Sequence, residues 1–105
     1  MKIRIGCDIV EIARISRLNE NSLQKIFHKT ELSKKPESLA GILAAKESCR
    51  KVFNDLNWHD IEIVKKKSGR PTVIINKPDV KCDLSISHDG GYAMATVIFM
   101  LEGGK

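Results

Sequence analysis

Four side chains have the types and spacing needed for chemistry on a phosphate. Glu47 and Lys51 lie four residues apart in the helix-forming stretch "LAGILAAKESCRKVF", whereas Asp8 and His88 lie where strands are expected to meet loops. Binding and catalytic residues concentrate at such loop junctions. Two carboxylates held together suit Mg²⁺, which leaves its other positions to water and to substrate phosphates. Lys51 could neutralise the same phosphates.

Glu47 and Lys51 also have an ordinary explanation. A surface ion pair at i, i+4 stabilises a helix by about 0.2–0.5 kcal/mol and needs no ligand. The residues around the pair, however, are Ala40, Leu43 and Ala44 rather than the long polar residues of a solvated face. Such small neighbours favour a function, because they allow a ligand or a second backbone to approach closely.

Asp8 and His88 each have a comparable structural alternative. Asp8 could cap a helix that begins with "IVEIARI", because aspartate is a favoured N-cap residue. His88 could hydrogen-bond within its own turn, as polar residues beside glycine often do. From the residues alone, both the structural and the functional interpretations stay open.

The elements that must position these side chains follow from hydrophobic periodicity. Alternation over residues 2–8 predicts a half-buried strand that Asp8 closes. Helical spacing is expected over about 9–18, and a short helix over 22–28. A long helix, with a proline tolerated in its first turn, is expected over about 36–54. Its apolar stripe comprises Ile42, Ala45, Cys49, Val52 and Phe53.

Two hairpins complete the predicted fold. "DIEIVKKKSGRPTVII" contains two β-rich runs around a turn in which Gly69 supplies a positive φ. "CDLSISHDGGYAMATVIFML" repeats this pattern around "HDGG", with His88 ending its first strand. The predicted fold is α+β, with one domain over residues 1–105 in which an antiparallel sheet packs against a long central helix.

The cysteines and the lack of a long apolar stretch indicate the cellular compartment. Ile3, Ile5 and Cys7 share one face of the first strand, and no CxxC pattern links Cys7 with Cys49 or Cys82. We interpret the three cysteines as reduced core residues. The N-terminal stretch lacks the continuous apolar run of a signal peptide, and no stretch approaches 18 apolar residues. These features predict a cytoplasmic protein that does not associate with a membrane.

The charge balance favours anionic partners. Eighteen basic and thirteen acidic residues give a net charge of +5, which suits phosphate-bearing or acidic ligands. A small RNA-binding module is one alternative. It has weak support, because the chain has five aromatic residues and no GXXG clamp for gripping an RNA backbone. We therefore expect no nucleic-acid partner.

Several segments together resemble one known family. "GCDIVEI", "LAGILAAKESCRK", "WHDIEI", "SGRP" and "LSISHDGGYAMATVI" resemble, in this order, segments of holo-acyl-carrier-protein synthases, the short bacterial type of 4′-phosphopantetheinyl transferase. The resemblance implies an Mg²⁺-dependent transferase of fatty acid biosynthesis with the fold of that family. It also implies that Asp8 and Glu47 hold Mg²⁺ and that Lys51 binds the pyrophosphate of coenzyme A.

The reaction implied by the resemblance joins coenzyme A to a carrier protein. A serine hydroxyl of apo acyl carrier protein attacks the β-phosphate, which yields the phosphopantetheinylated carrier and 3′,5′-ADP. Glu47, a water on the metal, and His88 are all candidates for the general base, with Glu47 or its water favoured. The resemblance further assigns coenzyme A contacts to Lys46, Lys51, Ser68, Gly69, Arg70, Pro71, Ser87 and His88.

Carrier docking and assembly are also expected from this resemblance. Arg14 and Arg17, on the exposed side of the first helix, should meet an acidic helix of the carrier. The short members of the family form homotrimers with shared active sites. Leu39 and Leu43 lie away from the core stripe of the long helix, so we expect that helix to contact a second chain as well as its own sheet.

The chain departs from the family pattern in two places, both on the coenzyme A side. Ile42 stands where family members usually carry an arginine, and only "NDLN" follows the long helix, where a glycine-rich loop is usual. These departures leave a third possibility, a relic of the transferase fold that no longer binds the nucleotide.

Overall fold

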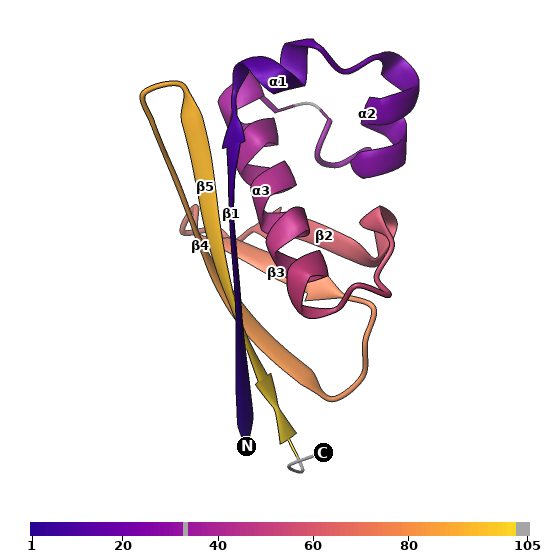
Figure 1. The fold of residues 1–105 in the computed structure, drawn as a ribbon, viewed down its shortest axis with the longest axis vertical. Coiled ribbons are helices and arrows are strands. Elements are labelled where there is room, and N and C mark those ends of the chain that lie inside the picture. The colour runs from indigo at the N-terminus through magenta and orange to yellow at the C-terminus, as the bar shows by residue number, and fades with distance from the viewer. Residues whose placement is uncertain (33, 103–105) are drawn as a thin grey trace.

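Long strands, a central helix and a separate hairpin make up the fold (Figure 1). The computed structural model describes residues 1–32 and 34–102. Along the chain the elements are β1 (Lys2–Glu11), α1 (Ala13–Ser16), α2 (Glu20–Ile26), α3 (Pro36–Val52), the 3₁₀ helix η1 (Trp58–Asp60), β2 (Ile61–Lys65), β3 (Pro71–Ile75), β4 (Val80–Asp89) and β5 (Tyr92–Leu101).

The strands form two antiparallel sheets rather than the single sheet expected. One sheet has three long strands in the order β1-β5-β4, and the other is the β2-β3 hairpin. Helix α3 lies across one face of the three-stranded sheet, where it packs on β1 and β5, and it also contacts β2 (Figure 1). The α+β class is therefore confirmed, with α3 packed against both sheets.

Helix α3 is buried almost all round, because it has neighbours on both sides. Pro36 stands at its first turn as predicted, and the helix ends at Val52, close to the expected boundary. Leu39 and Leu43 are buried inside this chain. The expectation that these two leucines would face a second chain is therefore wrong.

Strand β1 is longer than its sequence pattern indicates. It continues past Asp8 to Glu11, with Asp8 opposite Ala95 on β5, so Asp8 neither closes the strand nor caps a helix. The helix predicted over 9–18 is reduced to α1. Pairing with the full length of β5 outweighs the helical spacing, because each added residue continues the hydrogen-bonded ladder.

Strand β1 turns the opposite face to the core from the one that its apolar residues indicate. Its Ile residues point away from the core, and Ile5 is 67% exposed. The inward face carries Gly6, where a Cβ atom would collide with the backbone carbonyl oxygen of Ser48 on α3. Glycine is therefore needed at this crossing, since only its missing side chain lets strand and helix approach so closely.

The predicted β2-β3 turn, β4-β5 turn and short helix α2 are present with small shifts. Gly69 adopts a φ of +89° in the β2-β3 turn, as expected. The β4-β5 turn is Gly90–Gly91 alone, so His88 lies inside β4, and Asp89 rather than His88 ends that strand. Helix α2 starts two residues early because the Asn19 side chain accepts a hydrogen bond from Ser22 N–H and caps it.

The cysteines are all free but are not all in the core. Cys49 is buried and Cys82 is half-buried, whereas Cys7 is exposed on the outer face of β1. The core assignment of Cys7 is therefore wrong, for the same reason that the Ile face of β1 was misplaced. Within the described residues, no helix is long and apolar enough to cross a membrane.

Candidate active site

Asp8 and Glu47 are brought together where β1 crosses α3. Asp8 points inward from β1, two residues beyond Gly6, and Glu47 precedes Ser48 on the facing helix. Lys51, one helical turn along, places Nζ 3.0 Å from Asp8 Oδ1 and donates to the Cys7 carbonyl oxygen at 2.8 Å. The structure thus joins three of the predicted site residues.

The second oxygen of the Asp8 carboxylate marks a place for a cation. Asp8 Oδ2 is buried and has no hydrogen-bond partner among the described residues. Buried polar atoms are nearly always satisfied, so an unpartnered carboxylate oxygen fits a bound metal ion. No three His, Cys, Asp or Glu side chains of the described residues form a metal-binding group. Two carboxylates are nevertheless enough for Mg²⁺ in the presence of phosphates.

The proton affinities of the two carboxylates diverge. Burial and then the neighbouring Asp8 carboxylate raise the pKa of Glu47 to about 7, although Arg14 partly opposes the shift. Burial works in the same direction on Asp8, but interactions with Glu47 and the Lys51 ammonium outweigh it and lower the pKa of Asp8. One carboxylate is thus held ionised, while the other is able to take up a proton near neutral pH.

Arg14 belongs to this cluster in the structure. Its Nη2 atom lies 3.3 Å from Glu47 Oε1, across from α1 to α3. From the sequence this arginine was placed only on a docking surface, and its contact with Glu47 was not predicted. Arg17, three residues on, instead pairs with Glu11 at 3.0 Å.

Lys46 does not reach a ligand-facing surface. Its side chain is fully buried, with Nζ 2.7 Å from Glu31 Oε1 and 2.8 Å from the Ile26 carbonyl oxygen. Glu31 in turn accepts hydrogen bonds from the backbone N–H groups of His28 and Ile63. The assignment of Lys46 to the nucleotide of coenzyme A is therefore corrected: in this structure the lysine neutralises a buried carboxylate.

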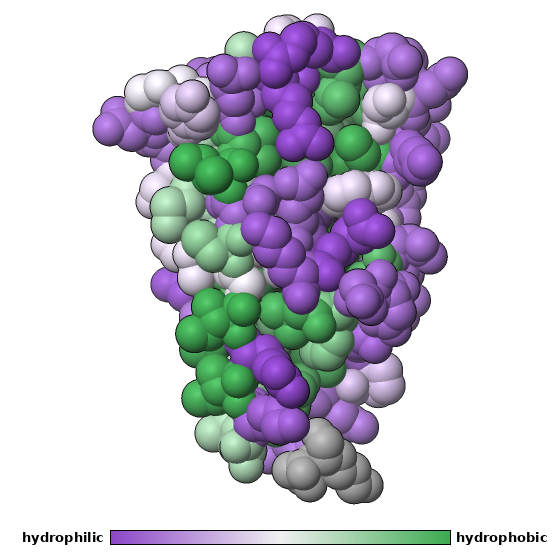
Figure 2. Space-filling view, viewed as in Figure 1, coloured by the Kyte–Doolittle hydropathy of each residue, from purple (hydrophilic) through white to green (hydrophobic). Residues whose placement is uncertain are grey.

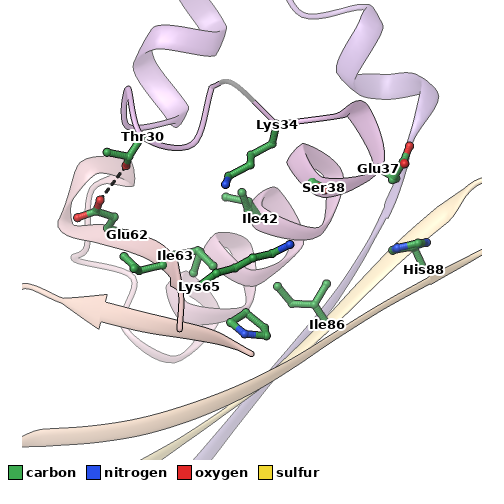
Figure 3. Close-up of a pocket in the computed structure, with 12 residues that line it drawn as sticks. Thr30, Lys34, Glu37, Ser38, Ile42, Glu62, Ile63, Lys65, Ile86 and His88 are labelled. Carbon is green, nitrogen blue, oxygen red and sulfur yellow. Dashed lines mark hydrogen bonds between the residues drawn. The ribbon is translucent and has the colours of Figure 1, made fainter. Parts of the chain in front are cut away.

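His88 lines a separate cavity of about 450 Å³ on the other side of α3 (Figure 3). Ser38 also lines this cavity, and nine residues at 100° each place it on the opposite side of the helix from Glu47. The floor is apolar, with Ile42 and Ile86, and Pro71 of the "SGRP" turn contributes to the wall. The lining also contains charged side chains that the sequence did not predict there, the cations Lys34 and Lys65 and the carboxylates Glu37 and Glu62.

The other predicted contacts are spread over different surfaces. Arg70 Nη2 donates to both carboxylate oxygens of Asp83 on β4, at 2.9 Å to Oδ1 and 2.8 Å to Oδ2. The backbone N–H of Arg70 donates to Ser68 Oγ. Ser87 lies on the opposite face of β4 from His88, because successive strand residues alternate. One chain therefore does not bring Ser87 and His88 into the same cavity.

A shallow hollow beside Glu47 and Lys51 is lined by three further residues that were not predicted, one of which is Asn54. Arg50 and Trp58 line it together with those residues, and the Arg50 guanidinium stacks 4.3 Å above the indole ring. The Nε atom of Arg50 also donates a hydrogen bond to the Leu56 carbonyl oxygen. Arg50 and Trp58 are visible in the sequence as "CRK" and a single tryptophan, but only the fold shows that the two side chains meet.

Comparison with known sequences points to one family. The model of the 4′-phosphopantetheinyl transferase superfamily matches residues 4–97. The holo-[acyl-carrier-protein] synthase of Nautilia profundicola is 40% identical, over 91% of this chain and 98% of that protein. The enzyme of the same name from Geobacillus sp. (strain WCH70) is 38% identical, over 93% of this chain and 96% of that protein.

Solved structures agree with the sequence comparison. Helicobacter pylori holo-[acyl-carrier-protein] synthase in complex with coenzyme A matches with a TM-score of 0.84 and 32% identity, over 92% of this chain and all of that one. The Bacillus anthracis enzyme, in complex with CoA (3′,5′-ADP), gives a TM-score of 0.83 and 29% identity over 93% and 96%. The chain therefore belongs to the 4′-phosphopantetheinyl transferase superfamily, among its holo-[acyl-carrier-protein] synthases.

Proposed function

We propose that this protein transfers the 4′-phosphopantetheine group of coenzyme A to a serine of apo acyl carrier protein and releases 3′,5′-ADP. The observation that carries the proposal is the pair of facing carboxylates, Asp8 and Glu47, with an unsatisfied Asp8 oxygen and the Lys51 ammonium beside them. Phosphoryl transfer depends on positioning and on neutralising charge, and this cluster offers both. The full-length similarity to holo-[acyl-carrier-protein] synthases supports the same reaction.

Each residue of the cluster has a role in this proposal. Asp8 and Glu47 would hold Mg²⁺, which when bound would help to neutralise the pyrophosphate of coenzyme A. Lys51 contacts the same phosphates from its exposed position on α3. Glu47, or a water on the metal beside it, is the favoured general base for the carrier serine. His88 contacts phosphate from the cavity that it lines.

The His88 cavity is proposed to hold the nucleotide end of coenzyme A. Its apolar floor suits a base, and Lys34 and Lys65 are placed to bind phosphate by charge. Ile42 forms part of that floor, so the loss of the family arginine removes one cation from a cavity that contains two others.

Within one chain, the Asp8–Glu47 cluster and the His88 cavity lie on opposite sides of α3. An active site shared between neighbouring chains would bring these two halves together. We infer a homotrimer in which the carboxylate cluster of one chain faces the His88 cavity of its neighbour. The supporting surface is the outer face of the β1-β5-β4 sheet, where Ile3, Ile5, Ile9 and Met94 are exposed. Figure 2 shows apolar side chains at the surface along the lower, strand-rich half of the molecule. Exposed apolar patches of this kind mark interfaces.

The proposal extends to the docking partner and the compartment. Arg14 and Arg17 of the α1 region offer positive charge to an acidic surface of the carrier, which would steer association. Three free cysteines agree with a reducing compartment, so we place the protein in the cytoplasm.

The reaction is tested by incubating the protein with coenzyme A, Mg²⁺ and apo acyl carrier protein, followed by mass spectrometry of the carrier. We expect the carrier to gain the phosphopantetheine mass with wild-type protein and not with Asp8→Asn. An unmodified carrier with the wild-type protein would refute the proposed function. Full activity of Asp8→Asn would refute the metal site alone.

The shared site is tested by mixing two inactive variants. Asp8→Asn disables the carboxylate cluster, and Lys34→Glu with Lys65→Glu disables the cavity. If the two halves come from different chains, subunit exchange should restore part of the activity, since some mixed interfaces contain both intact halves. Light scattering should give three chain masses. A fully active monomer would contradict the shared site.

A further inference from the structure

Arg14 has a contact that a pure docking residue does not need. Its guanidinium lies 3.3 Å from Glu47 Oε1, and the two side chains are 44% and 24% exposed. Glu47 is one of the two carboxylates assigned above to the metal. The Arg14 side chain therefore contacts the active site through Glu47 and is also accessible to a partner.

The neighbouring pair provides an internal comparison. Arg17 lies one turn further along the same segment and pairs with Glu11, which is not part of the carboxylate cluster. The two arginines share charge and exposed position, but only Arg14 contacts a proposed metal ligand. An effect specific to Arg14 can thus be separated from a general effect of surface charge.

We propose that Arg14 is a displaceable counter-ion of Glu47 that couples carrier docking to metal binding. A guanidinium and a divalent cation compete for the same carboxylate, because two positive charges at one oxygen repel each other. A carboxylate of the docked carrier would take the Arg14 guanidinium and leave Glu47 free for the metal. By linkage, metal binding would strengthen carrier binding by the same factor. This inference rests on the proposed function.

The direct test measures metal affinity without catalysis. Mn²⁺, which prefers the same oxygen ligands as Mg²⁺, is titrated into the protein in the absence of coenzyme A, with detection by electron paramagnetic resonance. Arg14→Ala should bind Mn²⁺ about three- to tenfold more tightly than the wild type, since both the ion pair and the repulsion are removed. Arg17→Ala is the matched control and should change the affinity little.

A second arm tests the coupling. Apo carrier whose acceptor serine is replaced by alanine is added at saturation, so that no transfer occurs. It should tighten Mn²⁺ binding to the wild type by a similar factor and leave Arg14→Ala unchanged, because that variant has no counter-ion to release. Arg17→Ala, with enough carrier to compensate for weaker docking, should respond as the wild type does.

The outcomes separate this inference from the function beneath it. Equal or weaker Mn²⁺ binding by Arg14→Ala would overturn the counter-ion role, and an unaltered affinity on adding carrier would overturn the coupling. Either result leaves the transferase proposal standing if the wild type still modifies its carrier. A wild type that binds no Mn²⁺ beyond the level of Asp8→Asn would instead remove the metal site itself, and this inference with it.

Discussion

Replacing Lys46 with methionine tests whether this lysine stabilises the fold or binds a ligand. Methionine retains most of the side-chain volume but removes the ammonium from Glu31, whose side chain is 1% exposed. Among the described residues the carboxylate then keeps two backbone N–H partners, from His28 and Ile63, and the Ile26 carbonyl oxygen loses the lysine donor. Removing one partner of a buried ion pair costs about 3–5 kcal/mol, because the remaining charge is uncompensated.

That loss is large for a domain of this size. The free energy of unfolding of a typical domain is about 5–15 kcal/mol, so Lys46→Met should remove about a fifth of the stability or more. The assay is urea unfolding followed by the fluorescence of Trp58, the one tryptophan in the sequence, at a single protomer concentration. Adding Glu31→Gln to Lys46→Met should recover part of the loss, because glutamine carries no charge and still accepts a hydrogen bond.

Lys51→Met is the matched control, with the same substitution on the same helix at a side chain that is 58% exposed. It should change the free energy of unfolding by less than about 1 kcal/mol while reducing transfer, because an exposed ion pair contributes little to stability. The reverse pattern, with Lys46→Met as stable as the wild type but weakened in coenzyme A binding, would refute the structural role of Lys46.

Three further predictions concern packing, pH and assembly. Gly6→Ala should lower the free energy of unfolding by about 3 kcal/mol or more in urea, because its methyl group meets the Ser48 backbone; a change below about 0.5 kcal/mol would contradict this crossing. Since the pKa of Glu47 rises from 4.5 to about 7 on folding, its protonation stabilises the metal-free fold below about pH 4.5, and this contribution should be lost as the pH rises to about 7. Excess Mg²⁺ should offset the loss, and a Glu47→Gln protein with the same pH slope as the wild type would count against it. Ile5→Lys, on the exposed face of β1, should shift light scattering towards single chains, and an unchanged mass would place the interface elsewhere.

Local patterns predicted the elements whose signals are contained within a few residues. The proline at the start of α3, the glycine of the β2-β3 turn and the alternation of β4 each depend on short-range sterics. The Asp8 and Glu47 pair was also predictable, because the "GCDIVEI" and "AAKE" segments resemble one family closely. In the structure Asp8 pairs with Lys51, and the shared metal of Asp8 and Glu47 stays a prediction.

Tertiary contacts decided which way these elements face. The alternation of β1 is visible in the sequence, but it does not say which face is inward, and the presence of Gly6 beside Ser48 outweighs the apolarity of Ile3 and Ile5. The end of β1 was likewise missed, because the length of β5, nearly ninety residues later, sets how far the ladder continues.

For the charged residues of α3, the sequence predicts their place on the helix, and the fold decides which of them are buried. The sequence alone determined that Lys46, Glu47 and Lys51 lie on one helix, since periodicity depends only on neighbours along the chain. Which of them is buried depends on what packs against each face of that helix. Glu31, from the turn before α3, neutralises Lys46, and Arg14, from α1, contacts Glu47, so both partners come from other parts of the chain. Ion pairs of that kind have no local signature, so only the folded chain decides them.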